Sequence, residues 1–256
     1  MVNELCILCF VKGSTIIKLS YLCRMKFGVV VFPGSNCDED LIHCLEQTTQ
    51  QEVVRLWHKD HDLQGCDMIF LPGGFSYGDY LRSGAIARFS PIMQNVIAFA
   101  NNGGFVMGIC NGFQILCEAG LLPGALIRNT NMKFTCDNVY LKTTSVNSLV
   151  TNSLDTNQAL KIPIAHGEGR YYADEATLKT LNDNDQILFK YCDAAGNITP
   201  ESNPNGSLQN IAGVTNSTRN VFGMMPHPER AASMEVFNTD GLGLFESIMK
   251  SAKMPA

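Results

Sequence analysis

Short apolar runs alternate with helix-like segments from Met25 almost to the end of the chain. The first run, Phe27–Phe32, is apolar or glycine throughout, as expected of a strand buried on both faces of a parallel sheet. Residues 38–49 follow, with apolar side chains at helical spacing and acidic residues in the first turn, where the helix dipole favours negative charge. This alternation predicts an α/β fold built on a doubly wound, mostly parallel sheet.

The remaining elements follow from the same patterns. Further strands are expected at 53–57, 68–71, 104–109, 139–146, 187–191, 211–214 and 221–224. Further helices are expected at 89–101, after residue 112 and around 241–252. The segment 193–209 is rich in Asn, Asp, Pro and Gly and is predicted to be a surface loop. No internal repeat appears, so we expect one domain.

Residues 1–24 differ from the rest of the chain. They hold three of the ten cysteines, and Lys12-Gly13-Ser14-Thr15 interrupts their apolar run, which disfavours a secretory signal. An added strand or an amphipathic flap is an alternative. We expect Met25 to be the natural start, residues 1–24 to be an extension outside the fold, and residues 25–256 to form the domain.

Charge and cysteine usage exclude several classes of protein. The 256 residues carry 19 basic and 24 acidic side chains, a net charge of −5, which argues against nucleic-acid binding. No apolar run is long enough to span a bilayer. The ten cysteines lack the spacing of a zinc site, so no metal is expected. Reduced thiols in a cytoplasmic protein are the simplest interpretation.

A candidate nucleophile lies at the end of the strand 104–109. The sequence Gly108-Ile109-Cys110-Asn111-Gly112 places a thiol at a strand–helix junction, in the pattern of a nucleophile elbow. Glycines two positions to either side would let the strand and the helix pass close together, and the helix dipole would favour a thiolate. The competing interpretation is a buried cysteine between two packing glycines.

A thiol nucleophile needs a base, and His227 is the candidate. It follows the strand 221–224 in Met225-Pro226-His227-Pro228-Glu229-Arg230. An extended i, i+2 pair would point both side chains the same way, so Glu229 could orient the His227 ring. Of the other histidines outside the 165–170 segment, His43 falls within a helix, whereas His58 and His61 flank a charged loop and are expected to be solvated. The competing interpretation of His227 is a plain turn residue between prolines.

Glycines also follow the strand 68–71. Gly73 and Gly74 could turn their N–H groups towards a ligand, and the N–H groups of Gly74 and Asn111 could form an oxyanion hole for Cys110. Neither a phosphate-binding loop nor a dinucleotide fingerprint occurs in the chain. Residues 165–170, Ala-His-Gly-Glu-Gly-Arg, are polar or small enough to line a pocket.

Together these segments resemble the class I glutamine amidotransferases, and the resemblance implies a flavodoxin-like order of the parallel strands. More narrowly, they are similar to the glutaminase subunit of phosphoribosylformylglycinamidine synthase. The resemblance covers residues 26–230 and is carried by FGVVVFPGSNCDED, FLPGGFSYGDYLRSGAIAR, GGFVMGICNGFQIL, AGLLPGALIRN, IAHGEGRYY and MPHPER. The sequence departs from the family pattern at Asp137, because a basic residue is expected directly after KFTC. This position would lie away from Cys110, His227 and Glu229, so the departure puts a partner or substrate contact in doubt and not the catalytic chemistry.

The resemblance implies a role for each matching residue. Cys110 would attack the side-chain amide of L-glutamine, His227 would shuttle the proton and Glu229 would orient His227. Gly74 and Asn111 would bind the oxyanion of the intermediate that leads to a γ-glutamyl thioester. The α-amino and carboxylate groups of glutamine would be held by Gly73, Gln114, Glu168 and Gly169.

The resemblance also implies partners. The ammonia would go to a separate synthetase subunit that uses ATP and Mg to convert formylglycinamide ribonucleotide into the amidine, with a small third subunit in the assembly. No cofactor is expected on this chain. Two alternatives stay open: an amidotransferase subunit of another synthetase, and a cysteine-elbow hydrolase, stress-type protein or non-catalytic module of similar topology.

Overall fold

The computed structural model describes residues 24–252. Its centre is a nine-stranded sheet in the order β2-β1-β3-β4-β11-β10-β9-β6-β7. The first five of these strands pair in parallel; they are β1 (Lys26–Val31), β2 (Glu52–Trp57), β3 (Met68–Leu71), β4 (Phe105–Ile109) and β11 (Val221–Met224). Residues 1–23, which include nearly all of the expected extension, lie outside the described residues.

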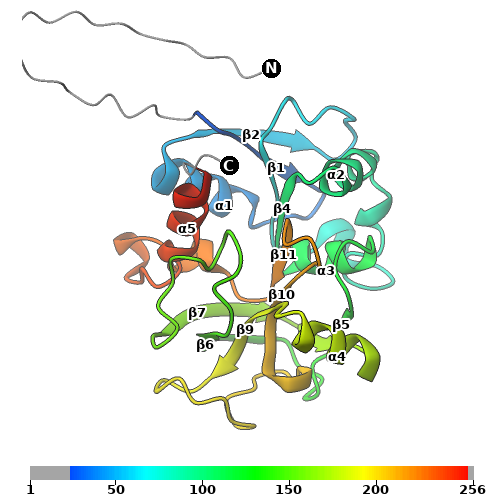
Figure 1. Cartoon of the computed structure of the whole chain (residues 1–256). Helices are drawn as coiled ribbons and strands as arrows, with labels where there is room; N and C mark the ends of the chain where they lie inside the picture. Colours follow the sequence, from blue (N-terminus) through cyan, green and yellow to red (C-terminus); the bar gives the residue numbers. More distant parts are fainter. Residues whose placement is uncertain (1–23, 253–256) are drawn as a thin grey trace, which may run out of the picture.

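The other four strands extend the sheet in an antiparallel manner. They are β6 (Thr135–Thr143), β7 (Ala159–His166), β9 (Ile187–Cys192) and β10 (Ile211–Thr215). A separate two-stranded sheet pairs β5 (Ala125–Ile127) with β8 (Arg170–Tyr172). The lower half of the molecule in Figure 1 is built from these elements.

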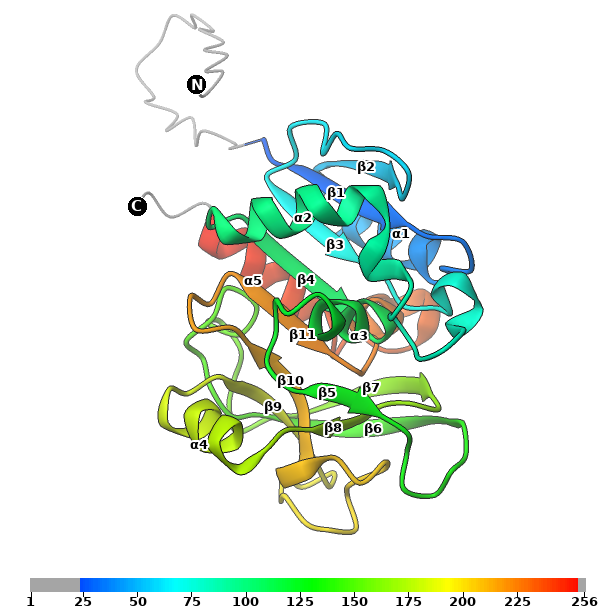
Figure 2. The ribbon, with the colours of Figure 1, turned by 90° about the vertical axis from the view of Figure 1, so that its right-hand side faces the viewer.

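Helices cover both faces of the parallel strands, so the predicted doubly wound architecture is confirmed. Helices α1 (Asp38–Thr49) and α5 (Leu242–Ala252) pack on one face, whereas α2 (Pro91–Asn101) and α3 (Asn111–Glu118) pack on the other (Figures 1 and 2). Helix α4 (Glu175–Asp183) flanks the antiparallel strands. No helix within residues 24–252 is both long and apolar enough to cross a membrane.

Local sequence explains where the elements begin and end. Strands β3 and β4 are buried at every position, because helices cover both of their faces. Helix α1 begins with three acidic residues, and α2 has Pro91 in its first turn, where a missing N–H costs nothing. The Asp174 carboxylate caps α4 by accepting a hydrogen bond of 2.7 Å from the Thr177 N–H.

The expected strands and the expected helices 38–49, 89–101 and 241–252 all occur, with ends that differ by a few residues. Strands β5, β7 and β8 and helix α4 were not predicted. In β7 the cause is Pro163, which argues against a strand; β7 is one of the two edge strands of the sheet, where proline is tolerated. The segment 193–209 is largely a loop, as predicted, but Asn205 in it is 1% exposed. Asp137 is exposed on β6.

Short 3-10 turns follow the carboxyl ends of the strands. Turn η1 (Ser76–Asp79) and turn η2 (Ala87–Phe89) lie in the loop after β3, and η3 (Leu208–Asn210) precedes β10. Turns η4 (Pro228–Ala231) and η5 (Met234–Val236) follow β11. Ligands of open α/β sheets bind at this edge, so these loops are where a site is expected.

Candidate active site

Cys110 lies at the junction between β4 and α3, as predicted. Its backbone has φ +50° and ψ −105°, a conformation that residues with side chains rarely adopt. The Cys110 N–H donates a hydrogen bond of 2.8 Å to the carbonyl of Met224 in β11, which holds the strained turn against the neighbouring strand. The residue is 4% exposed.

The glycines around Cys110 are required by close packing, as the sequence predicted. A Cβ on Gly108 would lie 2.6 Å from the backbone of Gly112, and a Cβ on Gly112 would lie 2.0 Å from the Leu71 carbonyl oxygen in β3. Any side chain at Gly112 would therefore push α3 away from the sheet. These contacts fix the height of Cys110 above the strand ends.

His227 and Glu229 come together after β11. The His227 Nδ1–H donates to the Glu229 carboxylate over 2.6 Å, and both side chains are almost completely buried. The pairing was predicted, but its predicted extended geometry is wrong, because Pro228–Ala231 forms the 3-10 turn η4. The His227 N–H also donates to the Pro163 carbonyl in β7 over 2.8 Å, which fixes the backbone of the turn.

The electrostatic environment of His227 suits a proton carrier. Burial alone would lower the pKa of His227, but the Glu229 carboxylate and the Cys110 thiolate outweigh burial and raise it. The Nε2 atom has no hydrogen-bond partner of normal geometry among residues 24–252. Glu229 thus orients the imidazole through Nδ1, whereas Nε2 is left without a hydrogen bond. The Cys110 side chain is close enough to the ring to raise its pKa. Long or misaligned catalytic hydrogen bonds are common before substrate binds.

The loop after β3 places two glycines beside this pair. A Cβ on Gly73 would lie 2.6 Å from Cε1 of His227, so the ring packs directly against this residue. Gly74 has φ +129°, and its N–H donates to no acceptor within residues 24–252. The Asn111 side chain accepts a hydrogen bond of 3.1 Å from the Ser76 N–H, which ties this loop to the start of α3.

The residues predicted to bind glutamine also lie together. The Gln114 side chain donates to the Glu168 carbonyl over 2.7 Å, and the Glu168 carboxylate accepts from the Ser83 N–H over 3.2 Å. Asn111 Nδ2 donates to Gln114 Oε1 over 2.9 Å, which links these residues to the helix that carries Cys110. The sequence predicted Gln114, Glu168 and Gly169; the structure brings Glu168 against Gln114 on α3, and Gly169 is the next residue in the chain.

Two buried asparagines that the sequence analysis did not single out hold Gly169. Its N–H donates to Asn129 Oδ1 over 3.0 Å, and its carbonyl accepts from Asn205 Nδ2 over 2.8 Å. Both asparagines are at most 1% exposed. Asn129 falls within GALIRN, a motif that carried the resemblance, whereas Asn205 lies in the predicted surface loop and gave no signal in one sequence.

Two further titratable groups in this region were not singled out. Burial is the main reason that the pKa of Asp79 is raised, to about 6. The nearby charge of Glu168 also raises this pKa, whereas the hydrogen bonds that Asp79 receives from Ser83 and Asn111 lower it. His166, at the end of β7, is 3% exposed, and neither ring nitrogen has a hydrogen-bond partner in the described chain. Burial, assisted by the charge of His227, lowers the pKa of His166 to about 4 and keeps the ring neutral.

The prediction that His58 is solvated is wrong. The residue is 4% exposed because the rings of Trp57 and Tyr77 pack against it. A hydrogen bond of 2.6 Å joins His58 Nδ1 to the Tyr77 hydroxyl, and the same hydroxyl lies 2.8 Å from Ser90 Oγ. His58 therefore anchors the loop that contains Gly73 and Gly74. His61 is exposed, and His43 lies on α1, as expected.

The other cysteines do not share this environment. The seven described cysteines are all free. Burial raises the pKa of five of them, which keeps their thiols protonated at neutral pH: Cys37, Cys44, Cys66, Cys117 and Cys192. No group of three or more His, Cys, Asp or Glu side chains within residues 24–252 is arranged to hold a metal ion.

Comparison with known proteins decides the family. The profile of the CobB/CobQ-like glutamine amidotransferase domain matches residues 24–242. A subunit PurQ of phosphoribosylformylglycinamidine synthase from Synechocystis is 58% identical over 222 residues, which are 87% of this chain and 99% of the relative. The corresponding subunit of Koribacter versatilis is 55% identical over 225 residues, 88% of this chain and 97% of the relative.

The chain belongs to the PurQ family. It is a glutamine amidotransferase, the glutaminase subunit of phosphoribosylformylglycinamidine synthase in purine biosynthesis. A solved structure, PurLQS from Thermotoga maritima, contains a chain that is 41% identical, with a TM-score of 0.79 over 90% of this chain and 99% of that one. PurQ membership therefore decides against an amidotransferase of another synthetase and against a hydrolase of similar topology.

Proposed function

We propose that Cys110, His227 and Glu229 form the catalytic triad that hydrolyses L-glutamine to glutamate and ammonia. The observation that carries this proposal is the buried His227–Glu229 pair, in which the His227 ring also interacts with the Cys110 thiol held on a strained strand–helix turn. A thiol at its ordinary pKa is only a few per cent thiolate at pH 7, so an adjacent base is needed to activate it.

The reaction runs in two halves. His227 takes the proton of the Cys110 thiol as the sulfur bonds to the side-chain carbonyl carbon of glutamine, and it gives that proton to the amide nitrogen as the carbon–nitrogen bond breaks. Ammonia leaves, and a γ-glutamyl thioester remains on Cys110. His227 then takes a proton from water, which attacks the thioester carbon. The carbon–sulfur bond breaks, His227 returns the proton to the Cys110 sulfur, and glutamate is released.

Backbone N–H groups stabilise the charge that develops on the carbonyl oxygen. The backbone N–H groups of Gly74 and Asn111 would supply two donors. The Asn111 side chain also fixes the loop that carries Gly74, because it accepts a hydrogen bond from the Ser76 N–H. Removal of one donor of this kind from an enzyme costs about 10²–10³ in rate. The glutamine α-amino and carboxylate groups would be held by Gly73, Gln114, Glu168 and Gly169, of which Glu168 supplies the negative charge that an α-amino group needs.

The ammonia would pass to a partner that this chain does not contain. We propose that the chain assembles with a separate synthetase subunit and a small third subunit, as the name of the PurLQS structure from Thermotoga maritima indicates for that complex. ATP and Mg would bind to the synthetase, which converts formylglycinamide ribonucleotide into the amidine. Free thiols on all seven described cysteines support a reducing, cytoplasmic location.

Active-site labelling tests the triad. The glutamine analogue 6-diazo-5-oxo-norleucine should alkylate Cys110 selectively, and Cys110→Ala should abolish both labelling and glutaminase activity. Cys117→Ala is the matched control, because Cys117 lies two turns along the same helix and its buried thiol is protonated. An adduct on another residue, or full activity in Cys110→Ala, would sink the assignment.

A further inference from the structure

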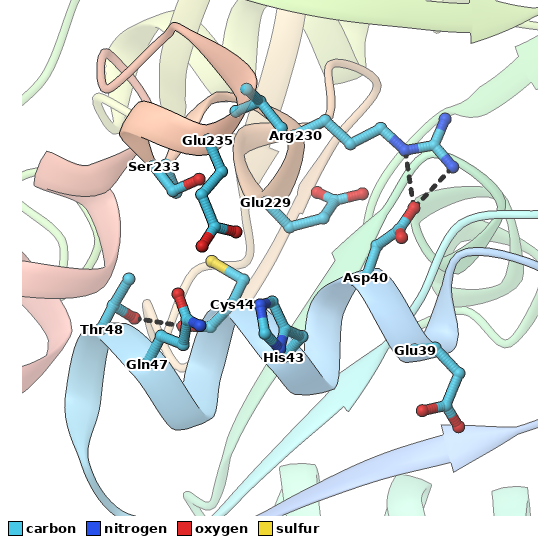
Figure 3. Close-up of a pocket in the computed structure, with 12 residues that line it drawn as sticks. Glu39, Asp40, His43, Cys44, Gln47, Thr48, Glu229, Arg230, Ser233 and Glu235 are labelled. Atoms are coloured by element: carbon cyan, nitrogen blue, oxygen red, sulfur yellow. Dashed lines mark hydrogen bonds and ion pairs between the residues drawn. The ribbon is translucent and has the colours of Figure 1, made fainter.

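A groove of about 640 Å³ lies behind the triad, between α1 and the turns that follow His227. Figure 3 shows that α1 contributes side chains three and four positions apart, so they share one face of the helix. The opposite wall comes from η4 and η5. The lining residues that matter here are Asp40, Cys44, Glu229, Arg230 and Glu235.

The groove has an excess of negative charge. Arg230 is engaged, because its guanidinium donates to the Asp40 carboxylate over 2.8 and 3.0 Å. Glu39, also on the α1 wall, is paired with Arg55. Glu235 is exposed and forms no ion pair within residues 24–252. An acidic groove whose own cation is already paired favours a basic occupant.

The floor of the groove connects it to the triad. Glu229 lines it, and the Oε2 atom of this carboxylate, buried on a side chain that is 1% exposed, has no hydrogen-bond partner in the described chain. Cys44 also lines the groove, and the Glu229 charge adds to the effect of burial in raising the pKa of its thiol. A buried carboxylate oxygen without a donor is costly, so a donor that approaches from the groove would relieve that cost.

Exposed apolar side chains gather at η5, the turn whose Val236 lines the groove and forms its apolar rim. Met234 and Val236 on η5 and Phe237 directly after it are 74%, 50% and 92% exposed. A patch of large apolar side chains that includes an aromatic and a methionine is typical of a protein interface rather than of a site for a small ion.

We propose that this groove and its apolar rim dock a basic segment of the ammonia-accepting synthetase subunit, with a lysine or arginine side chain entering beside Glu235 above Glu229. The proposal rests on the proposed function, since it assumes that such a partner exists. Occupancy would act on the η4 turn that holds His227 and Glu229. Docking and glutamine hydrolysis would therefore be coupled through Glu229, which acts as the positioning residue for His227.

The test uses the full chain and its cognate synthetase with the small subunit. Glu235→Lys should weaken the measured Kd for the synthetase by at least about tenfold and remove most of its salt dependence. Phe237→Ser should weaken the same Kd. Glutaminase activity of the isolated variants should stay within about twofold of the parent, because neither residue touches the triad.

Two matched variants control for charge and for apolar surface. Glu201→Lys changes an exposed acid in the distant loop 193–209, and Val146→Ser removes an exposed apolar side chain elsewhere; both should bind the synthetase as the parent does. A parental Kd in Glu235→Lys would overturn the proposal. A second result would also overturn it: spermidine stimulates the glutaminase activity of the isolated chain, while Glu235→Lys leaves the Kd for the synthetase unchanged. The groove would then bind a free cation rather than the synthetase.

The outcome is separable from that of the triad proposal. Suppose that the Glu235→Lys variant retains glutaminase activity and Cys110 labelling on its own, and that it also binds the synthetase with the parental Kd. Then only the docking proposal fails. If the parent chain with its synthetase shows neither activity nor labelling, the proposed function fails first.

Discussion

Cys110 is held by its neighbours in a backbone conformation that would cost about 1–3 kcal/mol on its own. The Met224 carbonyl binds its N–H, and Gly108 and Gly112 let the strand and the helix close around it. The strain therefore serves to keep the sulfur above the strand ends, next to the free nitrogen of His227. The groups of the candidate site are thus fixed before substrate arrives.

Glu229→Gln should keep the hydrogen bond to His227 but lose the charge. The pKa of His227 should fall, because the charge of the Glu229 carboxylate is the largest single effect that raises it, and kcat should fall by about 10²–10⁴. Steady-state kinetics and an NMR titration of the ring check both effects. Glu235→Gln, on the adjacent turn, is the control; an equal loss of activity in that variant would contradict the role of Glu229.

Asp79 should make the stability of the chain depend on pH in an unusual direction. Its folded pKa of about 6 exceeds the value of about 3.9 in an unfolded chain, so the folded state binds the proton more tightly. The contribution of Asp79 to the free energy of unfolding is therefore present below about pH 4 and is lost as the pH rises to about 6. Denaturant unfolding from pH 4 to 7 should show that Asp79→Asn removes this loss; an unchanged profile would contradict the burial of Asp79.

Helix α3 depends on its close approach to β3. Gly112→Ala would place a Cβ 2.0 Å from a backbone oxygen that cannot rotate away, so we expect a loss of about 1–3 kcal/mol or more in the free energy of unfolding. Glutaminase activity should also be lost, because α3 carries Asn111 and Gln114. Gly167→Ala is the control, since a Cβ there meets one side-chain atom at 3.8 Å; equal destabilisation by both changes would contradict the packing argument.

Sequence patterns predicted the elements that carry Cys110 and His227 better than the elements around them. Strands β3, β4 and β11 are short apolar runs with covered faces, and their carboxyl ends could be located directly. The geometry of η4 could not be predicted, because proline is compatible both with an extended chain and with the first position of a 3-10 turn. The burial of His58 also escaped prediction, since Tyr77 approaches it across a loop.

The parallel half of the sheet was predicted from the sequence, and the antiparallel half was not. Alternation of strands and helices specifies parallel pairing, but β6, β7, β9 and β10 join through loops whose lengths do not determine order or direction. That half nevertheless completes the site. Pro163 in β7 holds the His227 backbone, and Asn205, in the loop before β10, holds Gly169.

The proposed reaction requires that glutamine be hydrolysed through a thioester on Cys110. The most direct test is to mix the full chain with its synthetase and with glutamine, quench in acid during turnover, and locate the γ-glutamyl group by peptide mass spectrometry. We predict a γ-glutamyl adduct on Cys110 that is absent from Cys110→Ala. A thioester on another cysteine, or sustained turnover by Cys110→Ala, would contradict the account.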